Sequence, residues 1–310
     1  MKTYSLILLL ASCCLTINAQ SKIIYSVGEG KLNTGETPDL MIYNPVTQSS
    51  SILLKGTVQR RGESNAATST DGKRIIFNTY RFSGWKLGIG DMVNGKITNV
   101  KRFTNRKNYE YNPMWSHNSR KVVYQEFSWS TRENEIFVYD FTSKKTTQLT
   151  DSEGGDRTPS WTRDDSQIVF TSGRSGNYDI HIMGKNGEDV QNLTMHKAQD
   201  FAPSCSSKED KISFLSNRNN RMNLFVLDLG SNQLTNLTPN IKSNSFVMTS
   251  WQDSNGAGYK TSWSPDGKQI VFNVLIDGDL ELFIINADGT GLKQITDNTD
   301  SDFGPFWMSK

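Results

Sequence analysis

Short apolar runs alternate with polar turns along the whole chain, and one such pattern recurs. Five copies align over twelve residues without a gap, and a shortened sixth copy ends the chain: AATSTDGKRIIF (66–77), PMWSHNSRKVVY (113–124), PSWTRDDSQIVF (159–170), PSCSSKEDKISF (203–214), TSWSPDGKQIVF (261–272) and PFWMSK (305–310). Their third positions are residues 68, 115, 161, 205, 263 and 307, so the steps between copies are 47, 46, 44, 58 and 44 residues. A period in the mid-forties, made of short strands, is typical of a propeller blade.

Each repeat is predicted to hold four antiparallel strands, here named A to D. Strand A ends at the third position, and the apolar run after the next turn is strand B. Strands C are predicted in the remaining apolar runs, which are bounded by Gly, Asn, Asp and Ser: 135–141, 179–183, 223–229 and 281–286. None of the segments between the copies has a helical pattern.

The two ends of the chain complement each other. The first strands, at 22–27, 39–44 and 50–54, have no strand A, whereas the last copy is a strand A alone. We therefore expect an all-β fold, a six-bladed β-propeller closed by N-terminal strands that pair with the C-terminal strand. It should span residues 20–310, with a composite blade from 22–54 plus 303–310. Such pairing leaves no exposed sheet edge at the junction.

The first nineteen residues predict export. Lys2 precedes an apolar stretch, and Ala19 is a small residue at the expected cleavage position, so residues 1–19 form the predicted signal peptide of a periplasmic or secreted protein. The stretch is too short for a membrane-spanning helix of the mature protein. An alternative remains open, because Leu10 to Cys13 resembles a bacterial lipobox and would make a lipoprotein anchored through Cys13.

Composition argues against two classes of function. The 34 basic and 32 acidic residues nearly balance and form no basic block, so nucleic-acid binding has little support. After the leader, Cys205 is the single cysteine, and we interpret it as a buried small side chain rather than a nucleophile. His117, His181 and His196 do not share a blade position, so they predict no metal site, and no cofactor is expected.

An acidic residue recurs at the start of strand A in five of the six repeats. Because strand A is the innermost strand of a propeller blade, equivalent positions should form a ring at one mouth of the central channel. A ring of carboxylates there would attract a cation such as Ca²⁺ or a basic partner segment. The five residues are Glu63, Glu110, Asp156, Asp200 and Asp302, and Gly258 takes the sixth position.

Arginines offer these carboxylates a structural role instead. Arg81, Arg174 and Arg218 each lie four residues after the last aromatic residue of strand B, on a loop that should open at the same face. Pairing with the acidic residues would fix the blade geometry. The blades of Glu110 and Asp302 lack this arginine, so a bound cation is expected near those two.

The fourth repeat is followed by the longest step, and the additional residues form a predicted D–A loop at 239–259 on the same face. Long loops on rigid scaffolds are often functional, and Trp and Met favour interfaces. We predict that Phe246, Met248, Trp251 and Asp253 contact a partner. The alternative is that Phe246 and Trp251 pack onto their own blade.

The turn Ser264-Pro265-Asp266-Gly267 and the segment Ser172-Gly173-Arg174-Ser175-Gly176 resemble the repeats of TolB-type propellers, which are related to WD-type repeats. The resemblance covers the whole expected mature chain. TolB carries an additional N-terminal α/β domain, which this chain is expected to lack. It implies a periplasmic propeller that acts through protein–protein contacts, as TolB does with the Tol-Pal system. Similar propellers occur in prolyl oligopeptidases and in oligogalacturonate lyases.

Two functions therefore remain. The first is an exported, non-catalytic monomer that binds a protein or an envelope or glycan partner on its D–A/B–C loop face. The second is a carbohydrate-active lyase or hydrolase that uses the carboxylates of the channel mouth. The sequence supplies carboxylates but no Gly-x-Ser-x-Gly motif, no metal cluster and no evident base. It therefore favours the first function.

Overall fold

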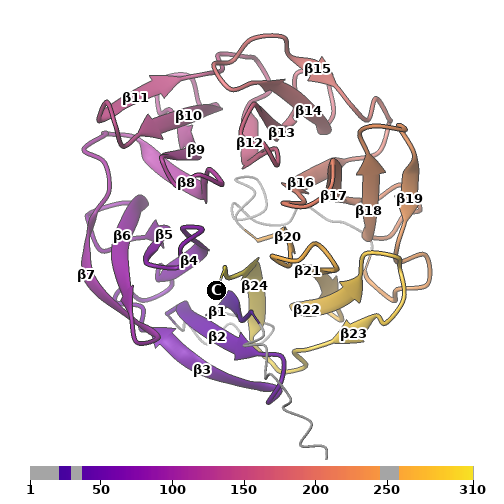
Figure 1. Ribbon diagram of the computed structural model, residues 1–310, viewed down its shortest axis with the longest axis horizontal. Helices are drawn as coiled ribbons and strands as arrows, with labels where there is room; N and C mark the ends of the chain where they lie inside the picture. Colours follow the sequence, from indigo (N-terminus) through magenta and orange to yellow (C-terminus); the bar gives the residue numbers. More distant parts are fainter. Residues whose placement is uncertain (1–20, 29–36, 245–257, 310) are drawn as a thin grey trace, which may run out of the picture.

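The computed structural model describes residues 21–28, 37–244 and 258–309. Within these ranges, twenty-four strands form six antiparallel sheets of four strands each, arranged as blades around one axis (Figure 1). The predicted six-bladed, all-β propeller is confirmed, and none of the described residues forms a helix. It follows that this part of the chain offers no long apolar helix of the kind that crosses a membrane.

Five blades are continuous in sequence, and each is built from four successive strands that run from the axis outward. Blade I contains β4 (Glu63–Thr68), β5 (Arg74–Thr79), β6 (Lys86–Val93) and β7 (Lys96–Arg102). Blade II contains β8 (Tyr109–Trp115), β9 (Lys121–Phe127), β10 (Asn134–Asp140) and β11 (Lys145–Gln148). Blade III contains β12 (Asp156–Trp161), β13 (Gln167–Ser172), β14 (Asp179–Gly184) and β15 (Gln191–Asn192). Blade IV contains β16 (Asp200–Cys205), β17 (Lys211–Ser216), β18 (Asn223–Asp228) and β19 (Leu234–Asn236). Blade V contains β20 (Thr261–Trp263), β21 (Gln269–Ile276), β22 (Asp279–Asn286) and β23 (Lys293–Gln294).

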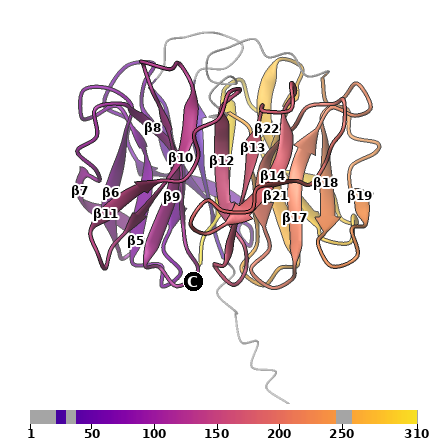
Figure 2. The same ribbon diagram turned by 90° about the horizontal axis from the view of Figure 1, so that it is seen from above.

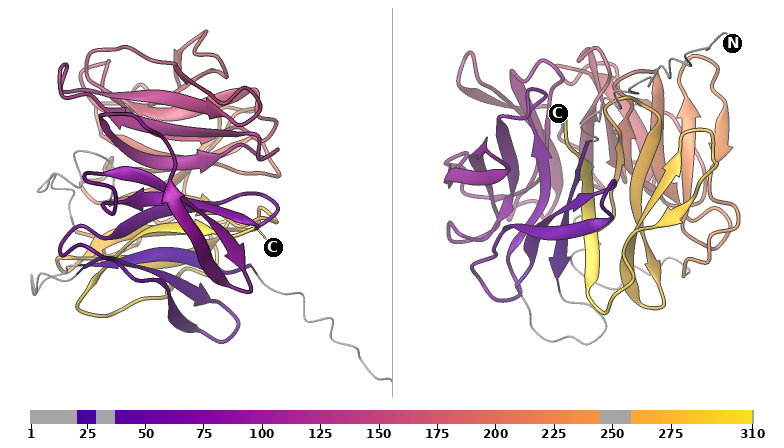
Figure 3. Two further views of the ribbon diagram at one scale, coloured as in Figure 1. Left: turned by 90° about the vertical axis from the view of Figure 1, so that its left-hand side faces the viewer. Right: turned by 60° about the horizontal axis from the view of Figure 1, so that its bottom comes forward.

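Blade VI joins the two ends of the chain. The last strand, β24 (Ser301–Trp307), is innermost and pairs antiparallel with β1 (Ile23–Gly28), which is followed outward by β2 (Asp39–Asn44) and β3 (Ser49–Leu54). The register runs from Ile23 opposite Trp307 to Gly28 opposite Ser301, and the indigo and yellow strands lie side by side in Figure 3. Ring closure therefore pairs the inner edge of β1, which would otherwise be exposed.

The core lies between the blades rather than within any one of them. Side chains from blades V and VI form one buried cluster that includes Val271, Leu282, Ile23 and Trp307. Each sheet lies between two neighbouring sheets around the ring (Figure 1), and its strands run across the thickness of the ring (Figure 2). This explains why strands B are nearly continuous apolar runs and not alternating ones. In blades I to V, strand B also carries one fully buried aromatic ring: Phe77, Tyr124, Phe170, Phe214 and Phe272.

Five of the six innermost strands carry a β-bulge at the same position, which the sequence analysis did not predict. The bulged residue lies three positions before the last residue of the strand. Its backbone is left-handed, with φ between 48° and 62°. These residues are Asn65, Asn112, Thr158, Ala202 and Gly304. Strand β20 is short and pairs without a register shift. A bulge re-aims the strand, and at Thr158 and Ala202 it holds a backbone conformation that such residues rarely adopt.

The bulges connect neighbouring blades. In three joints the backbone N–H of the bulged residue donates to a polar side chain on strand B of the preceding blade. The links are Asn112 N to Asn78 Oδ1 (3.1 Å), Thr158 N to Gln125 Oε1 (2.9 Å) and Ala202 N to Thr171 Oγ1 (3.1 Å). In blade V, Lys260 N donates to Asn273 Oδ1 of its own blade instead, at 2.9 Å. Blade V thus departs from the repeat in both its strand geometry and its linkage.

We expect Thr171→Val to destabilise the protein. The valine keeps the shape of the buried threonine but removes the acceptor of the Ala202 amide and the hydroxyl contact with Thr158. An unsatisfied buried donor costs about 1–3 kcal/mol, so the free energy of unfolding measured in urea should fall by that amount. The matched control is Thr235→Val on the exposed edge of β19, which should change the stability by less than about 0.5 kcal/mol. Equal effects of the two substitutions would refute the linking role of Thr171.

Candidate functional site

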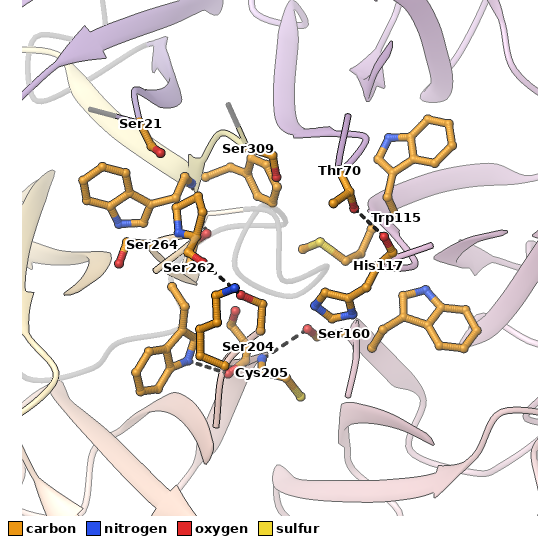
Figure 4. A pocket seen from close by; sticks show the side chains of 18 of the residues that line it. Ser21, Thr70, Trp115, His117, Ser160, Ser204, Cys205, Ser262, Ser264 and Ser309 are labelled. Carbon is orange, nitrogen blue, oxygen red and sulfur yellow. Dashed lines mark hydrogen bonds between the residues drawn. The ribbon is translucent and has the colours of Figure 1, made fainter. Parts of the chain in front are cut away.

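A cavity of about 920 Å³ opens at one end of the central channel. We call this end the turn mouth, because strands A end there and the turns to strands B surround it. The opposite end, with the D–A and B–C loops, is the loop mouth. Residues of all six blades line the cavity, together with Ser21 and Ser309 near the two ends of the described chain (Figure 4). The sequence analysis placed function at the loop mouth, so this cavity was missed.

Hydroxyl groups line one side of the cavity. Ser160, Ser204 and Ser262 occupy the same position in blades III, IV and V, one residue before the end of strand A. Two of them also join blades, because Ser160 Oγ accepts from Cys205 N at 3.3 Å and Ser262 Oγ accepts from Trp307 N at 3.1 Å. The equivalent residues of blades II and VI are Met114 and Phe306. The wall is therefore polar on one side and apolar on the other.

Four tryptophans at the ends of strands A support this wall. They are between 1% and 6% exposed, so they fill the joints between blades and present little surface to the cavity: Trp115, Trp161, Trp263 and Trp307. Trp263 Nε1 donates to the carbonyl oxygen of Ser204 in blade IV at 3.0 Å. Trp115 stacks on Phe141 with ring centroids 5.1 Å apart, and the guanidinium carbon of Arg74 lies 4.3 Å from its ring centroid. These contacts hold the tryptophan rings in place behind the wall.

Polar contacts link blades I to IV along the rim of the turn mouth. Thr70 Oγ1 donates to the carbonyl oxygen of His117 at 2.7 Å. His117 N in turn donates to Asp165 Oδ1 at 2.7 Å, and the His117 ring nitrogen Nδ1 lies 3.0 Å from the same oxygen. Arg163 and Asp210 form an ion pair of 3.2 Å between the next two blades. The rim is thus a preformed frame.

The cavity offers groups for binding but no evident set for catalysis. Burial raises the pKa of the Cys205 thiol to about 12, so it stays protonated and poorly nucleophilic near neutral pH. Among the described residues that line the cavity, Asp266 is the one carboxylate and His117 the one imidazole. His117 is held by Asp165, as described above, and Asp266 accepts from Ser264 Oγ at 2.6 Å. This arrangement can hold a ligand through hydroxyls, cations and apolar surface.

The five predicted acidic residues start strands A at the loop mouth, but they do not face solvent there. All five are completely buried: Glu63, Glu110, Asp156, Asp200 and Asp302. The sequence period places them correctly along the strand. It could not reveal that neighbouring strands and loops cover each carboxylate. The expected open ring of negative charge therefore differs from what the structure contains.

Three of these carboxylates are paired with the arginines of their own blades. Arg81 Nε lies 2.7 Å from Glu63 Oε1. In blade III, Arg174 Nη2 lies 2.8 Å from Asp156 Oδ2. In blade IV, Arg218 Nη2 lies 2.6 Å from Asp200 Oδ2. Each arginine is only partly exposed, so the pairs hold the start of strand A to the B–C loop of the same blade.

Glu110 and Asp302 have neutral partners in place of an arginine. Glu110 accepts from Thr104 Oγ1, and Asp302 accepts from Asn298 Nδ2 at 2.7 Å. Burial raises the pKa of each carboxyl group to about 7, and the nearby carboxylates Glu126 and Glu281 add to this shift. The hydrogen bonds, and for Glu110 the ammonium of Lys86, oppose it.

Further buried carboxylates on strands C were missed by the sequence analysis. Glu135 and Glu281 accept from Thr150 Oγ1 and Thr296 Oγ1, both at 2.6 Å, and each threonine also accepts from a strand C amide. Burial raises the pKa of Glu135 to about 7. The signal was present in the repeats, because an acidic residue near the start of strand C recurs with a threonine after strand D.

The two carboxylates near which a cation was expected lie in different blades. Glu110 lies in blade II and Asp302 in blade VI, with blade I between them. Within the described ranges, no group of three or more His, Cys, Asp or Glu side chains is placed to hold a metal ion. His117 lies at the turn mouth, His181 is buried in β14, and His196 follows β15. The predicted contact residues Phe246, Met248, Trp251 and Asp253 lie outside the described residues.

Comparison with known proteins gives one family match. Residues 57–250 match the family model described as the TolB beta propeller domain. The fold is similar to TolB from Acinetobacter baumannii, with a TM-score of 0.74 at 19% identity, and the match covers 93% of this chain and 66% of that one. The putative TolB from Agrobacterium tumefaciens gives a TM-score of 0.66 at 14% identity and 91% coverage of both chains. At these identities the structural likeness shows the fold alone.

A shorter sequence match was found with dipeptidyl-peptidase 5 of Porphyromonas gingivalis. It is 42% identical over 52 residues, which are 15% of this chain and 8% of the peptidase. The chain thus covers just under two thirds of the A. baumannii TolB and a small part of the peptidase.

Glu110 and Asp302 should lower the stability of the protein as the pH rises. Their folded pKa of about 7 lies above that of an unfolded carboxyl group. Each carboxyl group therefore makes its full contribution to the stability of the folded state below about pH 4. This contribution is lost as the pH rises through 7. We expect Glu110→Gln with Asp302→Asn to be more stable than the parent at pH 8 by about 1–3 kcal/mol. The difference should vanish near pH 4, which urea unfolding at both pH values will test.

A paired carboxylate gives the control. Asp200→Asn leaves the Arg218 guanidinium without its buried counter-ion, so this substitution should destabilise the protein at pH 8 by about 3–5 kcal/mol. If the double variant also loses stability at pH 8, the two unpaired carboxyl groups do not behave as described.

Proposed function

The chain belongs to the TolB β-propeller domain family, and on that basis we propose that it is an exported, non-catalytic scaffold that holds a protein segment in its turn mouth. The observation that carries this proposal is the cavity of about 920 Å³ to which every blade contributes. Its size lies near the upper end of common ligand sites. We further propose that the protein acts as a monomer in the periplasm or outside the cell.

The chemistry of the wall favours a polypeptide. Serine and threonine hydroxyls both donate and accept, as a peptide backbone does, and they dominate one side of the cavity at Ser160, Ser204 and Ser262. Met114 and Phe306 offer apolar surface for side chains on the other side. The linked rim keeps this site preformed, which lowers the entropic cost of binding.

A carbohydrate-active lyase or hydrolase is supported less well. Such an enzyme needs two carboxylates, or a carboxylate and a base, that face the substrate. The five acidic residues of strands A are completely buried, and three of them are in ion pairs. Asp266 alone supplies a carboxylate to the described wall of the cavity.

The D–A loop at 239–259 is proposed as a second contact region on the opposite face. Its residues Phe246, Met248, Trp251 and Asp253 would bind a protein or envelope partner there. This proposal rests on the length and composition of the loop.

A photo-crosslinking residue at Lys208 will test the turn mouth. Lys208 is exposed on the rim of the cavity. With benzoylphenylalanine there, we expect a discrete crosslinked protein in cells. Benzoylphenylalanine at Lys145, on exposed strand β11, should give at least about tenfold less crosslinked product, because binding contacts concentrate at the centre of an interface. Equal crosslinking at both positions, or crosslinking only from Ser130 at the loop mouth, would contradict the proposed site.

The loop is tested separately. We expect Phe246→Ala with Trp251→Ala to reduce recovery of an envelope partner in a pull-down by at least about tenfold, which corresponds to truncating one or two interface anchors. The control is Leu234→Ala, an exposed apolar residue of β19. Unchanged recovery by the double variant would remove this loop from the interface.

A further inference from the structure

A stripe of aromatic side chains crosses the joint between blades I and II at the loop mouth. We call Tyr80, Trp85, Tyr111, Tyr109 and Trp129 the aromatic stripe, in the order in which they touch. Successive ring centroids are 5.5, 6.1, 6.4 and 5.1 Å apart. The contacts are edge-on or tilted, which are favourable arrangements for aromatic pairs. The five rings therefore form one connected surface from two blades.

The stripe is anchored at its centre and open at one end. Trp85 and Tyr111 are buried, Tyr80 and Tyr109 are half-buried, and Trp129 is 56% exposed. Among the large apolar side chains that the described residues expose, Trp129 is the one aromatic ring. A single exposed apolar side chain is ordinary, but an exposed indole that continues a connected row of rings forms a larger apolar feature of the kind that marks binding sites.

Trp129 is held in place although it is exposed. Its B–C loop is closed by Ser128 N to the carbonyl oxygen of Glu133 (2.9 Å) and by Arg132 N to that of Ser128 (2.8 Å). Phe127 and Tyr109 contact the indole edge-to-face, each with a centroid distance of 5.1 Å. The exposed ring is consequently preorganised and loses little freedom on binding.

Hydrogen bonds from a buried lysine hold the D–A loop that leads into Tyr109. Lys86, which is buried, donates from Nζ to the carbonyl oxygens of Arg106 (3.0 Å), Lys107 (2.9 Å) and Asn108. Glu126 accepts from Asn108 Nδ2 at 2.9 Å and pairs with Arg106. These bonds fix the position of Tyr109. Gly84 leaves room for its ring, since a Cβ there would come within 2.9 Å of the Tyr109 Cε1 atom.

Among the described residues, the exposed charge on the blade I side of the stripe is positive, whereas the exposed Asp151 and Glu153 lie on the next D–A loop, beyond Glu133. Glu63, Glu110 and Glu126 of this joint are buried, and Glu133 is half-buried. The side chains that reach solvent instead are cationic: Arg60, Arg61, Lys107 and Arg132. Arg61 adjoins the first ring, because its Nη1 donates to Tyr80 Oη at 2.7 Å and its guanidinium carbon lies 4.8 Å from the ring centroid. Arg132 shares the closed loop of Trp129.

We propose that the aromatic stripe, flanked by Arg61 and Arg132, binds an acidic saccharide, with a sugar ring stacked on Trp129. A pyranose ring has an apolar face of C–H groups and hydroxyls around its edge. That shape matches an exposed indole whose loop also carries the hydroxyls of Ser128, Ser130 and Thr131. The arginines supply counter-ions for the carboxylates of the sugar. This site lies at the opposite end of the propeller from the cavity and does not depend on the function proposed for it.

Calorimetric titration of the whole protein with oligosaccharides from alginate and from hyaluronan tests the proposal. Dextran fragments serve as the neutral sugar and short polyglutamate as the anion without a sugar ring. We expect Trp129→Ala to weaken binding of at least one acidic oligosaccharide by tenfold or more, and Arg61→Ala with Arg132→Ala to do the same. The matched control is Met195→Ala, an exposed apolar side chain outside this joint, which should change affinity by less than twofold.

Five results would overturn the proposal, and four of them come from the titrations. They are no binding of either acidic oligosaccharide, equal binding by Trp129→Ala and the parent, polyglutamate binding as tight as that of the sugars, and dextran binding as tight as that of the sugars. A protein captured through Trp129 without any saccharide binding would also overturn it. Thermal unfolding of each variant checks that its fold is intact, and Lys208 crosslinking in the Trp129→Ala variant reports on the turn mouth independently.

Discussion

Both faces of every blade are covered by its neighbours, and this burial is the constraint on which the rest of the structure depends. Polar groups of the innermost strands that point into the joints are removed from solvent, so hydrogen bonds within the blade or across a joint stabilise them. The bulge amides of Asn112, Thr158 and Ala202 are satisfied across a joint. Ser160 and Ser262 serve the same end at the turn mouth. Hydrophobic packing assembles the ring, and these hydrogen bonds fix the register of one blade against the next.

The same constraint explains what could be predicted from the sequence. Strand positions, the six blades and the closure of blade VI followed from the period, because each repeat folds as a local unit. The burial of Glu63, Asp156 and Asp200 did not, since it depends on what covers them in three dimensions. The bulge in strand A was not predicted for a related reason. The bulged residues are Asn, Thr, Ala and Gly, and these residue types share no side-chain property that marks the position. The cavity was missed because each of its serines is unremarkable until six blades bring them together.

The two ends of the propeller are built for different purposes. At the loop mouth, buried carboxylates, threonines and arginines hold strands A and C to their loops, and the joint between blades I and II presents an aromatic surface flanked by exposed arginines. At the turn mouth, short turns leave a hollow lined with hydroxyls, supported from behind by tryptophans. Blade V departs from the repeat at β20, where the bulge and its link are both missing and a long segment separates it from β19.

Ser21 and Ser309, which lie next to the first and last strands of blade VI, both line the cavity at the turn mouth. Any peptide joined to the chain close to either residue is therefore tethered beside the site. Over a short flexible linker its effective concentration there is on the order of millimolar. Even a weakly complementary sequence would occupy the cavity at that concentration. A tag or fused domain whose sequence fits the cavity would therefore compete with a free ligand, whereas a circular permutant with ends on a peripheral strand would leave the mouth free.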